Sequence, residues 1–263
     1  MRICKGQGKR GETGMKEYKN YIFDLYGTLV DIHTNESKAS LWKNMAEIYS
    51  LIGVPYTAKE LKGQYKKLAR EEIIEIKPRI VRKYSDELLA DEEIEICLEN
   101  VFRKLFVQKG AAVDDMQIRQ LGIVFRSLSF GYVRLYEGVA ELLMRLKQSG
   151  KRIYLLSNAQ RIFTEPEMRM LGIYESFDGI LYSSDAGVKK PSRHFFDALF
   201  TKYNLRKEES VMVGNEYRTD IYGAERYGID SMYVFTAQSG EKPVMLPNNC
   251  RRLKRISEVL EAV

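Results

Sequence analysis

Four short groups of polar residues, each placed directly after an apolar run, are the part of this sequence that could do chemistry. An ionised carboxylate can act as a nucleophile or bind a hard cation, and a nearby lysine can neutralise negative charge that develops during a reaction. Hydroxyl and amide side chains can donate hydrogen bonds to an anionic substrate. In chain order the groups are Asp24 with the turn at Gly27 and Thr28, the pair Ser157 and Asn158, the pair Lys190 and Pro191, and the segment 214–220.

These groups can meet only if the apolar runs before them are neighbouring strands of one sheet. The run Tyr21, Ile22, Phe23 has the aromatic and β-branched character of a buried strand. After residue 136, short apolar runs alternate with amphipathic segments, a pattern typical of a parallel sheet built from βαβ units. Such sheets hold ligands at the carboxyl ends of their strands, where all four groups would lie. We predict strands at 20–25, 152–156, 179–182, 211–213 and 232–235, and helices at 138–149, 164–171, 192–203 and 217–227.

A helical segment separates the first polar group from the other three. From about residue 34 to 133, apolar residues recur every three to four positions, as at Trp42, Met45 and Tyr49. This spacing predicts an all-helical domain at 32–134, inserted into a sheet domain formed by 15–31 and 135–263. We expect hinges near 30–34 and 130–136, and helices within the insertion around 39–52, 61–73, 91–108 and 114–130.

The composition is that of a globular protein without a membrane segment. Of the 263 residues 44% are hydrophobic, and no apolar run approaches the roughly 18 residues that would span a bilayer, so we predict a cytoplasmic location. The net charge of +6 is spread over Lys and Arg interleaved with Asp and Glu, and we expect no nucleic-acid partner. The three cysteines lack CxxC spacing and are predicted to be free thiols. Residues 1–14 are Gly-rich and basic and are expected to be disordered, which makes Met15 a candidate for the true start.

Together the four groups resemble the motifs of the haloacid dehalogenase superfamily, which occur in this order around a Rossmann-like sheet. FDLYGTLVD is similar to the first motif, LLSN to the second, the Lys190–Pro191 step to the third and VGNEYRTDIYGA to the fourth. The resemblance implies an α/β fold with a Rossmann-like core, and it identifies the helical insertion as the family's cap domain. It also implies a hydrolase that works through a covalent aspartyl intermediate on a small anionic substrate, as a monomer or homodimer.

The resemblance also implies roles for individual residues. Asp24 would be the nucleophile, and Lys190 would keep it ionised and neutralise developing negative charge. Ser157 and Asn158 would bind the anionic oxygens of the substrate, together with the turn at Gly27 and Thr28. A Mg²⁺ ion would be held by Asp24, the backbone oxygen of Tyr26 and polar residues of the fourth motif, namely Asn215, Glu216 and Asp220.

Two positions depart from the pattern of the family's phosphatases. Tyr26 stands two residues after the nucleophile, where the phosphatases have an Asp that acts as acid and base, and where 2-haloacid dehalogenases have Tyr. Tyr26 is therefore a candidate catalytic residue, with a structural role as the alternative. Asn215 replaces the first metal-binding Asp, although Glu216 and Asp220, four residues apart, could compensate. We favour a Mg²⁺-dependent phosphatase of a small phosphorylated metabolite.

Two other functions stay open: a metal-independent dehalogenase, and a catalytically weak member that binds an anionic ligand. A dehalogenase would need an arginine for the substrate carboxylate. The candidates for that arginine, by charge alone, are Arg70, Arg79 and Arg82.

Overall fold

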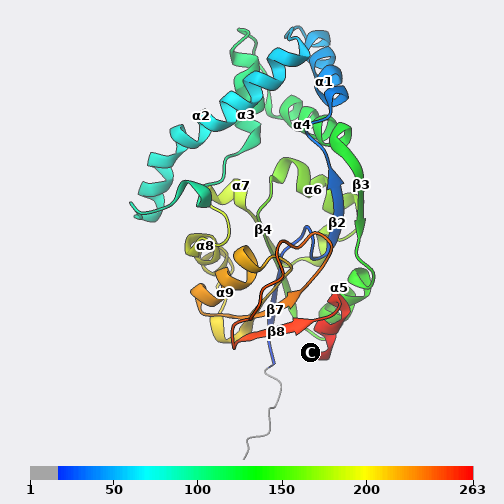
Figure 1. Cartoon of the computed structure of the whole chain (residues 1–263), viewed down its shortest axis with the longest axis vertical. Helices are drawn as coiled ribbons and strands as arrows, with labels where there is room; N and C mark the ends of the chain where they lie inside the picture. The colour runs from blue at the N-terminus through cyan, green and yellow to red at the C-terminus, as the bar shows by residue number, and fades with distance from the viewer. Residues whose placement is uncertain (1–16, 263) are drawn as a thin grey trace, which may run out of the picture.

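The structure, a computed structural model, describes residues 17–262 and contains a six-stranded parallel sheet in the order β5-β4-β1-β6-β7-β8 (Figure 1). The predicted α/β fold with a parallel sheet is confirmed, and the last strand is one that we did not predict. The predicted disordered segment 1–14 and Met15 lie outside the described residues. The strands are β1 (Asn20–Phe23), β4 (Arg152–Ser157), β5 (Gly179–Tyr182), β6 (Ser210–Gly214), β7 (Asp230–Val234) and β8 (Cys250–Leu253).

Strand β1 is central and is buried on both faces. Because alternate residues of a strand point to opposite faces, Ile22 packs into one apolar cluster while Tyr21 and Phe23 pack into another. Helices α8 and α9 contribute to the first cluster, and α5 and η5 contribute to the second. These helices and the shorter elements near the sheet are α5 (Val139–Gln148), α6 (Arg161–Met170), η2 (Tyr174–Ser176), α7 (Ser183–Ala186), α8 (Arg193–Tyr203), η3 (Lys207–Glu209), the π-helix η4 (Tyr217–Ile221), α9 (Tyr222–Tyr227) and η5 (Ile256–Ala262).

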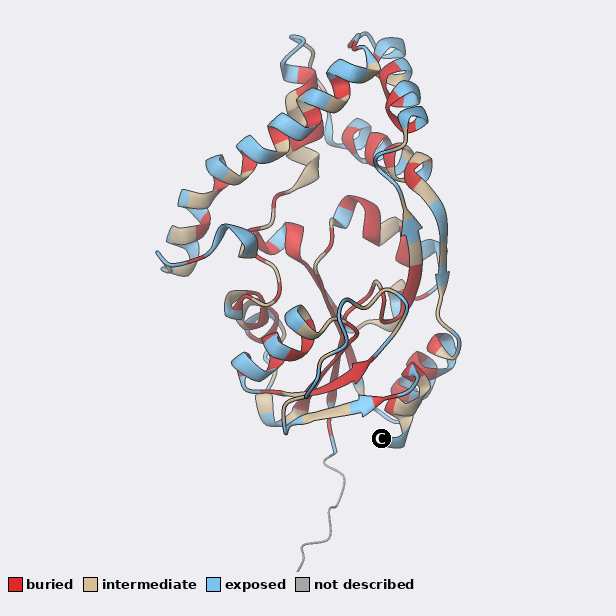
Figure 2. Ribbon diagram, in the orientation of Figure 1, coloured by how far each residue is buried: buried red, intermediate tan, exposed pale blue. Residues whose placement is uncertain are grey.

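The inserted segment forms a block of helices beyond the sheet (Figure 1). Two of its helices begin at capping boxes, in which the side chain of Thr57 or Asp114 accepts a hydrogen bond from the third helical residue. Its interior is aromatic, since Trp42 packs against Tyr65 and Phe125. Figure 2 shows buried residues on the inner faces of these helices and exposed residues on the outer faces. The helices are α1 (Ala39–Leu51), α2 (Ala58–Tyr84), η1 (Asp91–Glu93), α3 (Leu98–Val107) and α4 (Asp115–Ser129).

The link between the helical block and the sheet is a two-stranded antiparallel ribbon. Strands β2 (Val30–Thr34) and β3 (Phe130–Leu135) pair along the two segments where we predicted hinges. The prediction that the helical pattern extends to residue 133 is therefore wrong for its last residues. Residues 130–135 form β3, a short alternating run whose backbone N–H and C=O groups pair with those of β2. Arg134 fixes the ribbon by binding Asp31 with two N–H groups, at 2.9 and 2.7 Å.

Two further predictions concern cysteines and membranes. Cys97 and Cys250 are free thiols as predicted, and Cys4 lies outside the described residues. Between residues 17 and 262 there is no helix that is long and apolar enough to cross a membrane.

Candidate active site

A tight turn at the end of β1 presents Asp24. The carbonyl oxygen of Leu25 accepts hydrogen bonds from the N–H groups of residues 28–30, which folds the chain back at once. Gly27 has φ +84°, a left-handed conformation that glycine adopts without strain. The N–H of Asp24 donates to Val213 O at 3.0 Å. The carboxylate of Asp24 is therefore held at the carboxyl end of β1, beside β6.

Three buried charged side chains meet at this point, and we call them the Asp24 cluster: Asp24, Lys190 and Asp220. Lys190 Nζ lies 2.6 Å from Asp24 Oδ1 and 2.7 Å from Asp220 Oδ1. Only 2% of Lys190 and 1% of Asp220 is exposed to solvent, compared with 8% of Asp24. The polar groups that follow β1, β5 and β6 in sequence therefore converge.

The charges of this cluster depend on one another. Burial raises the pKa of Asp24 to about 6, although the ammonium group of Lys190 acts in the opposite direction. Burial alone would lower the pKa of Lys190, but the carboxylates of Asp220 and Asp24 raise it above its ordinary value. Lys190 is therefore charged, and it is the group that keeps a carboxylate ionised in a site with little water.

The second polar group holds the backbone of Lys190. Asn158 Oδ1 accepts a hydrogen bond from Lys190 N at 2.7 Å, and Asn158 Nδ2 donates to Lys190 O at 3.0 Å. The peptide bond between Lys190 and Pro191 is cis. Asn158 thus positions Lys190, and its contact with a substrate stays a prediction. The hydroxyl of Ser157, which is 1% exposed at the end of β4, forms no hydrogen bond with any residue between 17 and 262.

The fourth polar group contributes Asn215, which packs against the first turn. Thr28 Oγ1 lies 3.0 Å from Asn215 Oδ1 and 3.3 Å from Asp24 Oδ2. Asn215 Nδ2 donates to Ser239 Oγ at 3.3 Å. A Cβ atom on Gly27 would lie 2.4 Å from Asn215 Nδ2, so the absence of a side chain at Gly27 is what lets the two motifs meet.

The variant Gly27→Ala tests this contact. We expect it to lower the free energy of unfolding by about 2–4 kcal/mol, because strain at positive φ adds to a collision with Asn215. Gly53→Ala is the matched control, since Gly53 has φ +81° with no atom within 4 Å of an added Cβ. Urea unfolding of both variants separates the two effects, and equal losses would show that the contact with Asn215 contributes nothing.

The carboxylate of Glu216 lies outside the Asp24 cluster. Its Oε2 accepts a hydrogen bond from Gly240 N at 2.9 Å, and its Oε1 accepts one from Arg218 N at 3.4 Å. Asp220 Oδ2 accepts from Glu216 N at 2.9 Å, so only the backbone of Glu216 reaches the cluster. Within residues 17–262, no three Asp, Glu, His or Cys side chains form a group that could hold a metal ion.

The phenol of Tyr26 forms hydrogen bonds with α6 and not with the Asp24 cluster. Its hydroxyl donates to Glu167 Oε2 and lies 3.0 Å from Thr164 Oγ1, both on α6. Arg126 of α4 binds the other oxygen of Glu167 at 2.6 Å, and its guanidinium carbon lies 5.8 Å from the centre of the Tyr26 ring. Burial, followed by the charge of Glu167, raises the pKa of Tyr26 well above its usual value. Tyr26 is therefore a neutral donor to a carboxylate.

Sequence reasoning missed Arg126, Thr164 and Glu167. Thr164 and Glu167 are three residues apart, which places them on one face of α6, but that spacing is equally typical of an ordinary helix surface. Arg126 comes from the inserted block, and no local pattern links it to a residue so distant in sequence. Only the packing of α4 against α6 shows the connection.

Comparisons with known proteins identify the family of this chain. Residues 18–228 match the family model of the haloacid dehalogenase-like hydrolases. A glyceraldehyde 3-phosphate phosphatase of Methanothermobacter thermautotrophicus is 30% identical over 112 residues, which make up 43% of this chain but only 50% of that protein. The HAD-hydrolase YfnB of Bacillus subtilis is 23% identical over 248 residues, which cover 94% of this chain and 97% of YfnB. A solved 2-haloacid dehalogenase of Pseudomonas syringae has a TM-score of 0.61 at 20% identity, covering 93% of this chain and 97% of that one, and this likeness shows the fold alone.

Proposed function

The chain belongs to the haloacid dehalogenase-like hydrolases, and on that premise we propose that it hydrolyses small phosphorylated metabolites with Asp24 as the nucleophile. The observation that carries this proposal is the contact of Lys190 with both Asp24 and Asp220 in a buried site at the carboxyl ends of strands. The similarity to a glyceraldehyde 3-phosphate phosphatase supports a phosphate ester as substrate.

The proposed reaction has two steps. Lys190 holds Asp24 Oδ1, so the other oxygen, Oδ2, attacks phosphorus while the bond from phosphorus to the leaving-group oxygen breaks. Water then attacks the same phosphorus and releases phosphate, which restores the carboxylate of Asp24. In both steps Lys190 neutralises negative charge, and the hydroxyl of Ser157 would bind a phosphoryl oxygen. The N–H groups of Gly27 and Thr28 donate to Val30 O and Leu25 O, so we no longer assign them to the substrate.

The residues present fit a Mg²⁺ ion, provided that Glu216 is not among its ligands. Mg²⁺ is commonly held by one or two carboxylates with water and substrate phosphate completing its shell. Asp24 and Asp220 supply two carboxylates, and the backbone oxygen of Tyr26 accepts no hydrogen bond from residues 17–262. When bound, the ion would reduce repulsion between the anionic nucleophile and the anionic substrate.

Removal of the metal tests this assignment. We expect EDTA, and separately Asp220→Asn, to reduce hydrolysis of acetyl phosphate by at least about 10²-fold, because both remove charge stabilisation in a buried site. Glu216→Gln is the matched control and is expected to keep activity within about threefold, since its oxygens bind backbone N–H groups. Equal losses for Glu216→Gln and Asp220→Asn would contradict this choice of ligands.

The proposed role of Tyr26 is structural, and this restricts the substrates. A phenol that donates to Glu167 cannot also protonate a leaving alkoxide, so good leaving groups such as an acyl phosphate are favoured. We expect Tyr26→Phe to keep hydrolysis of acetyl phosphate within about fivefold of wild type. Unfolding in urea should show a loss of about 1–3 kcal/mol, because Glu167 loses a donor in a buried site. A loss of activity above about 10²-fold with unchanged KM would instead make Tyr26 catalytic.

A second candidate function is dehalogenation of a short 2-haloacid without metal. The observation that favours it is Tyr26 two residues after Asp24, combined with the position of Glu216 outside the Asp24 cluster. Halide leaves without a proton, so the missing acid would not matter. Halide release that persists in EDTA and is lost in Asp24→Asn would support this function over phosphate hydrolysis.

We also propose that residues 32–134 act as a cap over the site and that the β2–β3 ribbon is its hinge. The ribbon connects the helical block to the turn that carries Asp24, and Arg126 and Glu167 join α4 to α6. Closure of such a cap would exclude water from the reaction, and opening would admit the substrate.

A further inference from the structure

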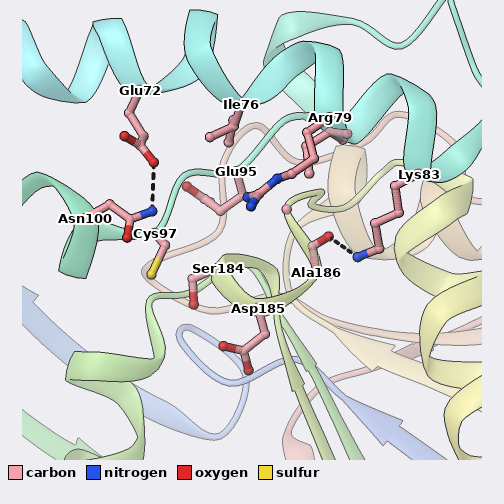
Figure 3. A pocket seen from close by; sticks show the side chains of 12 residues that line it. Glu72, Ile76, Arg79, Lys83, Glu95, Cys97, Asn100, Ser184, Asp185 and Ala186 are labelled. Carbon is pink, nitrogen blue, oxygen red and sulfur yellow. Dashed lines mark hydrogen bonds between the residues drawn. The ribbon is translucent and has the colours of Figure 1, made fainter. Parts of the chain in front are cut away.

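A cavity of about 330 Å³ lies where α2 of the helical block faces α7 beside the sheet, and we call it the seam pocket (Figure 3). Its lining includes none of the three residues of the Asp24 cluster. This volume lies within the range of about 300–1,000 Å³ that is typical of sites for small molecules. The lining residues that matter here are Arg79, Ile80 and Lys83 of α2, Glu95 and Asn100 of the following segment, and Ser184 of α7.

The two walls of the seam pocket are in close contact. A Cβ atom on Gly187, which has φ +79°, would lie 2.3 Å from Ile80 Cδ1. Lys83 Nζ and Tyr84 Oη both donate to Ala186 O, at 2.9 and 3.0 Å. The end of α2 therefore contacts the last residue of α7, Ala186, and the next residue, Gly187.

The segment after α7 leads from this contact into the active site. Glu95 N donates to Gly187 O at 3.0 Å, and Lys189 N donates to Glu93 O at 2.9 Å, which pairs the two segments as a short antiparallel bridge. Lys190 is the next residue along the chain. A ligand in the seam pocket would thus contact both α2 and α7. The segment after α7 continues to Lys190 of the Asp24 cluster.

Two cationic side chains of the seam pocket lack a negative partner. The guanidinium of Arg79 points into the pocket in Figure 3 and forms no ion pair or hydrogen bond with residues 17–262. The ammonium of Lys83 binds the carbonyl oxygen of Ala186 and lies 4.8 Å from the centre of the Tyr84 ring, and neither group carries a negative charge.

The acidic side chains of the lining are already occupied. Glu72 forms an ion pair with Lys104, and Asp185 forms one with Arg161 at 2.7 Å. Lys104 is shared with Glu75, and neither Arg79 nor Lys83 takes part in these ion pairs.

Glu95 forms no salt bridge with residues 17–262. Burial raises the pKa of its carboxyl group, although the charge of Lys189 acts in the opposite direction. Its Oε1 accepts from Gln160 Nε2 and Ile96 N, both at 3.2 Å, and its Oε2 accepts from Ser183 Oγ at 3.2 Å. Ser184 Oγ accepts from Arg161 N at 3.0 Å and donates to no acceptor among residues 17–262. The pocket therefore offers two cations and a hydroxyl donor to a ligand.

We propose that the seam pocket binds the phosphate group of a small molecule, with Arg79 and Lys83 as charged contacts and Ser184 as a hydrogen-bond donor. A phosphate group carries a charge of about −1.5 to −2 at neutral pH, which matches two cations, and a guanidinium binds its oxygens in a fixed fork. The bound group joins α2 to α7 and stabilises the contact between the helical block and the sheet. This site is separate from the substrate site at Asp24.

Calorimetric titration tests the proposal with inorganic phosphate in one arm and glycerol 3-phosphate in the other. The protein is the full chain carrying Asp24→Asn, which prevents turnover, so the result does not depend on the proposed hydrolase activity. We expect the double variant Arg79→Gln with Lys83→Gln to bind the tighter of these two ligands at least tenfold more weakly. Tighter binding of glycerol 3-phosphate indicates a phosphorylated metabolite as the ligand, and equal binding indicates free phosphate.

Arg70→Gln with Lys66→Gln is the matched control, because it removes two positive charges from α2 outside the pocket. Unchanged affinity in the Arg79 and Lys83 variant, or an equal loss in the control, would overturn the proposal. In protein that retains Asp24 and is therefore able to turn over substrate, both double variants should keep the wild-type KM for acetyl phosphate. A higher KM in the Arg79 and Lys83 variant alone would place the seam pocket within the substrate site and would also overturn the proposal.

Discussion

Asp24→Asn is expected to reduce hydrolysis of acetyl phosphate and p-nitrophenyl phosphate by at least about 10⁴-fold, because an amide oxygen is too weak a nucleophile to form the covalent intermediate. The substitution keeps the size of the side chain and leaves Lys190 paired with Asp220. Loss of activity should therefore occur without loss of the fold. The measurement is release of inorganic phosphate by purified protein with Mg²⁺, compared with circular dichroism melting of the same sample.

Asp115→Asn serves as the control for Asp24→Asn, since Asp115 is an exposed residue of α4 that forms an ion pair with Arg103 of α3. We expect it to retain full activity. Wild-type turnover in Asp24→Asn would show that another residue is the nucleophile. Absence of turnover in the wild-type protein with both substrates would direct the search to halide release.

Lys190→Met is expected to have the largest effect on stability, lowering the free energy of unfolding by about 3–5 kcal/mol at neutral pH. The reason is that Asp24 and Asp220 would face each other in a buried site without a cation. Urea unfolding in EDTA measures this loss. Lys189→Met, on the adjacent and less buried lysine, is expected to cost less than about 1 kcal/mol.

The loss in Lys190→Met should depend on pH and on the second acid. Burial raises the pKa of Asp24, so its repulsion with Asp220 acts above that pKa and disappears below it, where Asp24 binds a proton. The penalty should therefore shrink between about pH 8 and about pH 5. Adding Asp220→Asn should recover at least about half of the loss, because one carboxylate remains. A penalty that is independent of both pH and Asp220 would mean that Lys190 contributes through packing alone.

Most of the sheet could be predicted because five of its six strands carry a local signal. Short β-branched and aromatic runs followed by polar residues identified five of its strands, and the family resemblance that they supported is confirmed. The run at 250–253 escaped notice because Cys250, Arg251 and Arg252 give it no apolar core pattern, and its strand exists only by pairing with β7. The ribbon of β2 and β3 escaped notice because its strands lie at the two ends of the insertion, so no short stretch of sequence shows that they pair.

The residues of the candidate site could be predicted where a sequence motif contains them. The direction in which a side chain points could not be predicted, because it depends on partners from other parts of the chain. The convergence of Asp24, Lys190 and Asp220 was predicted from the order of their motifs. Asp24 directly follows β1, whereas Lys190 comes after α7 and Asp220 lies in η4. Whether Glu216 turns toward the cluster depends on a bond to Gly240, which comes from a later loop. Tyr26 was ambiguous for the same reason, because its partner Glu167 lies on a helix that no motif marks.

The central position of β1 has a consequence for how this chain reaches its native state. Asn20 pairs with Arg152 on one side and with Ser210 on the other, so both neighbours of this strand are made long after it leaves the ribosome. Contacts so remote in sequence slow folding, whereas the helices of the insertion pack mostly on one another. A nascent chain that ends before β6 would have a helical block but an apolar strand with one bare edge, a form prone to aggregation. Chaperones that shield nascent chains should therefore be needed by this protein mainly for its first strand.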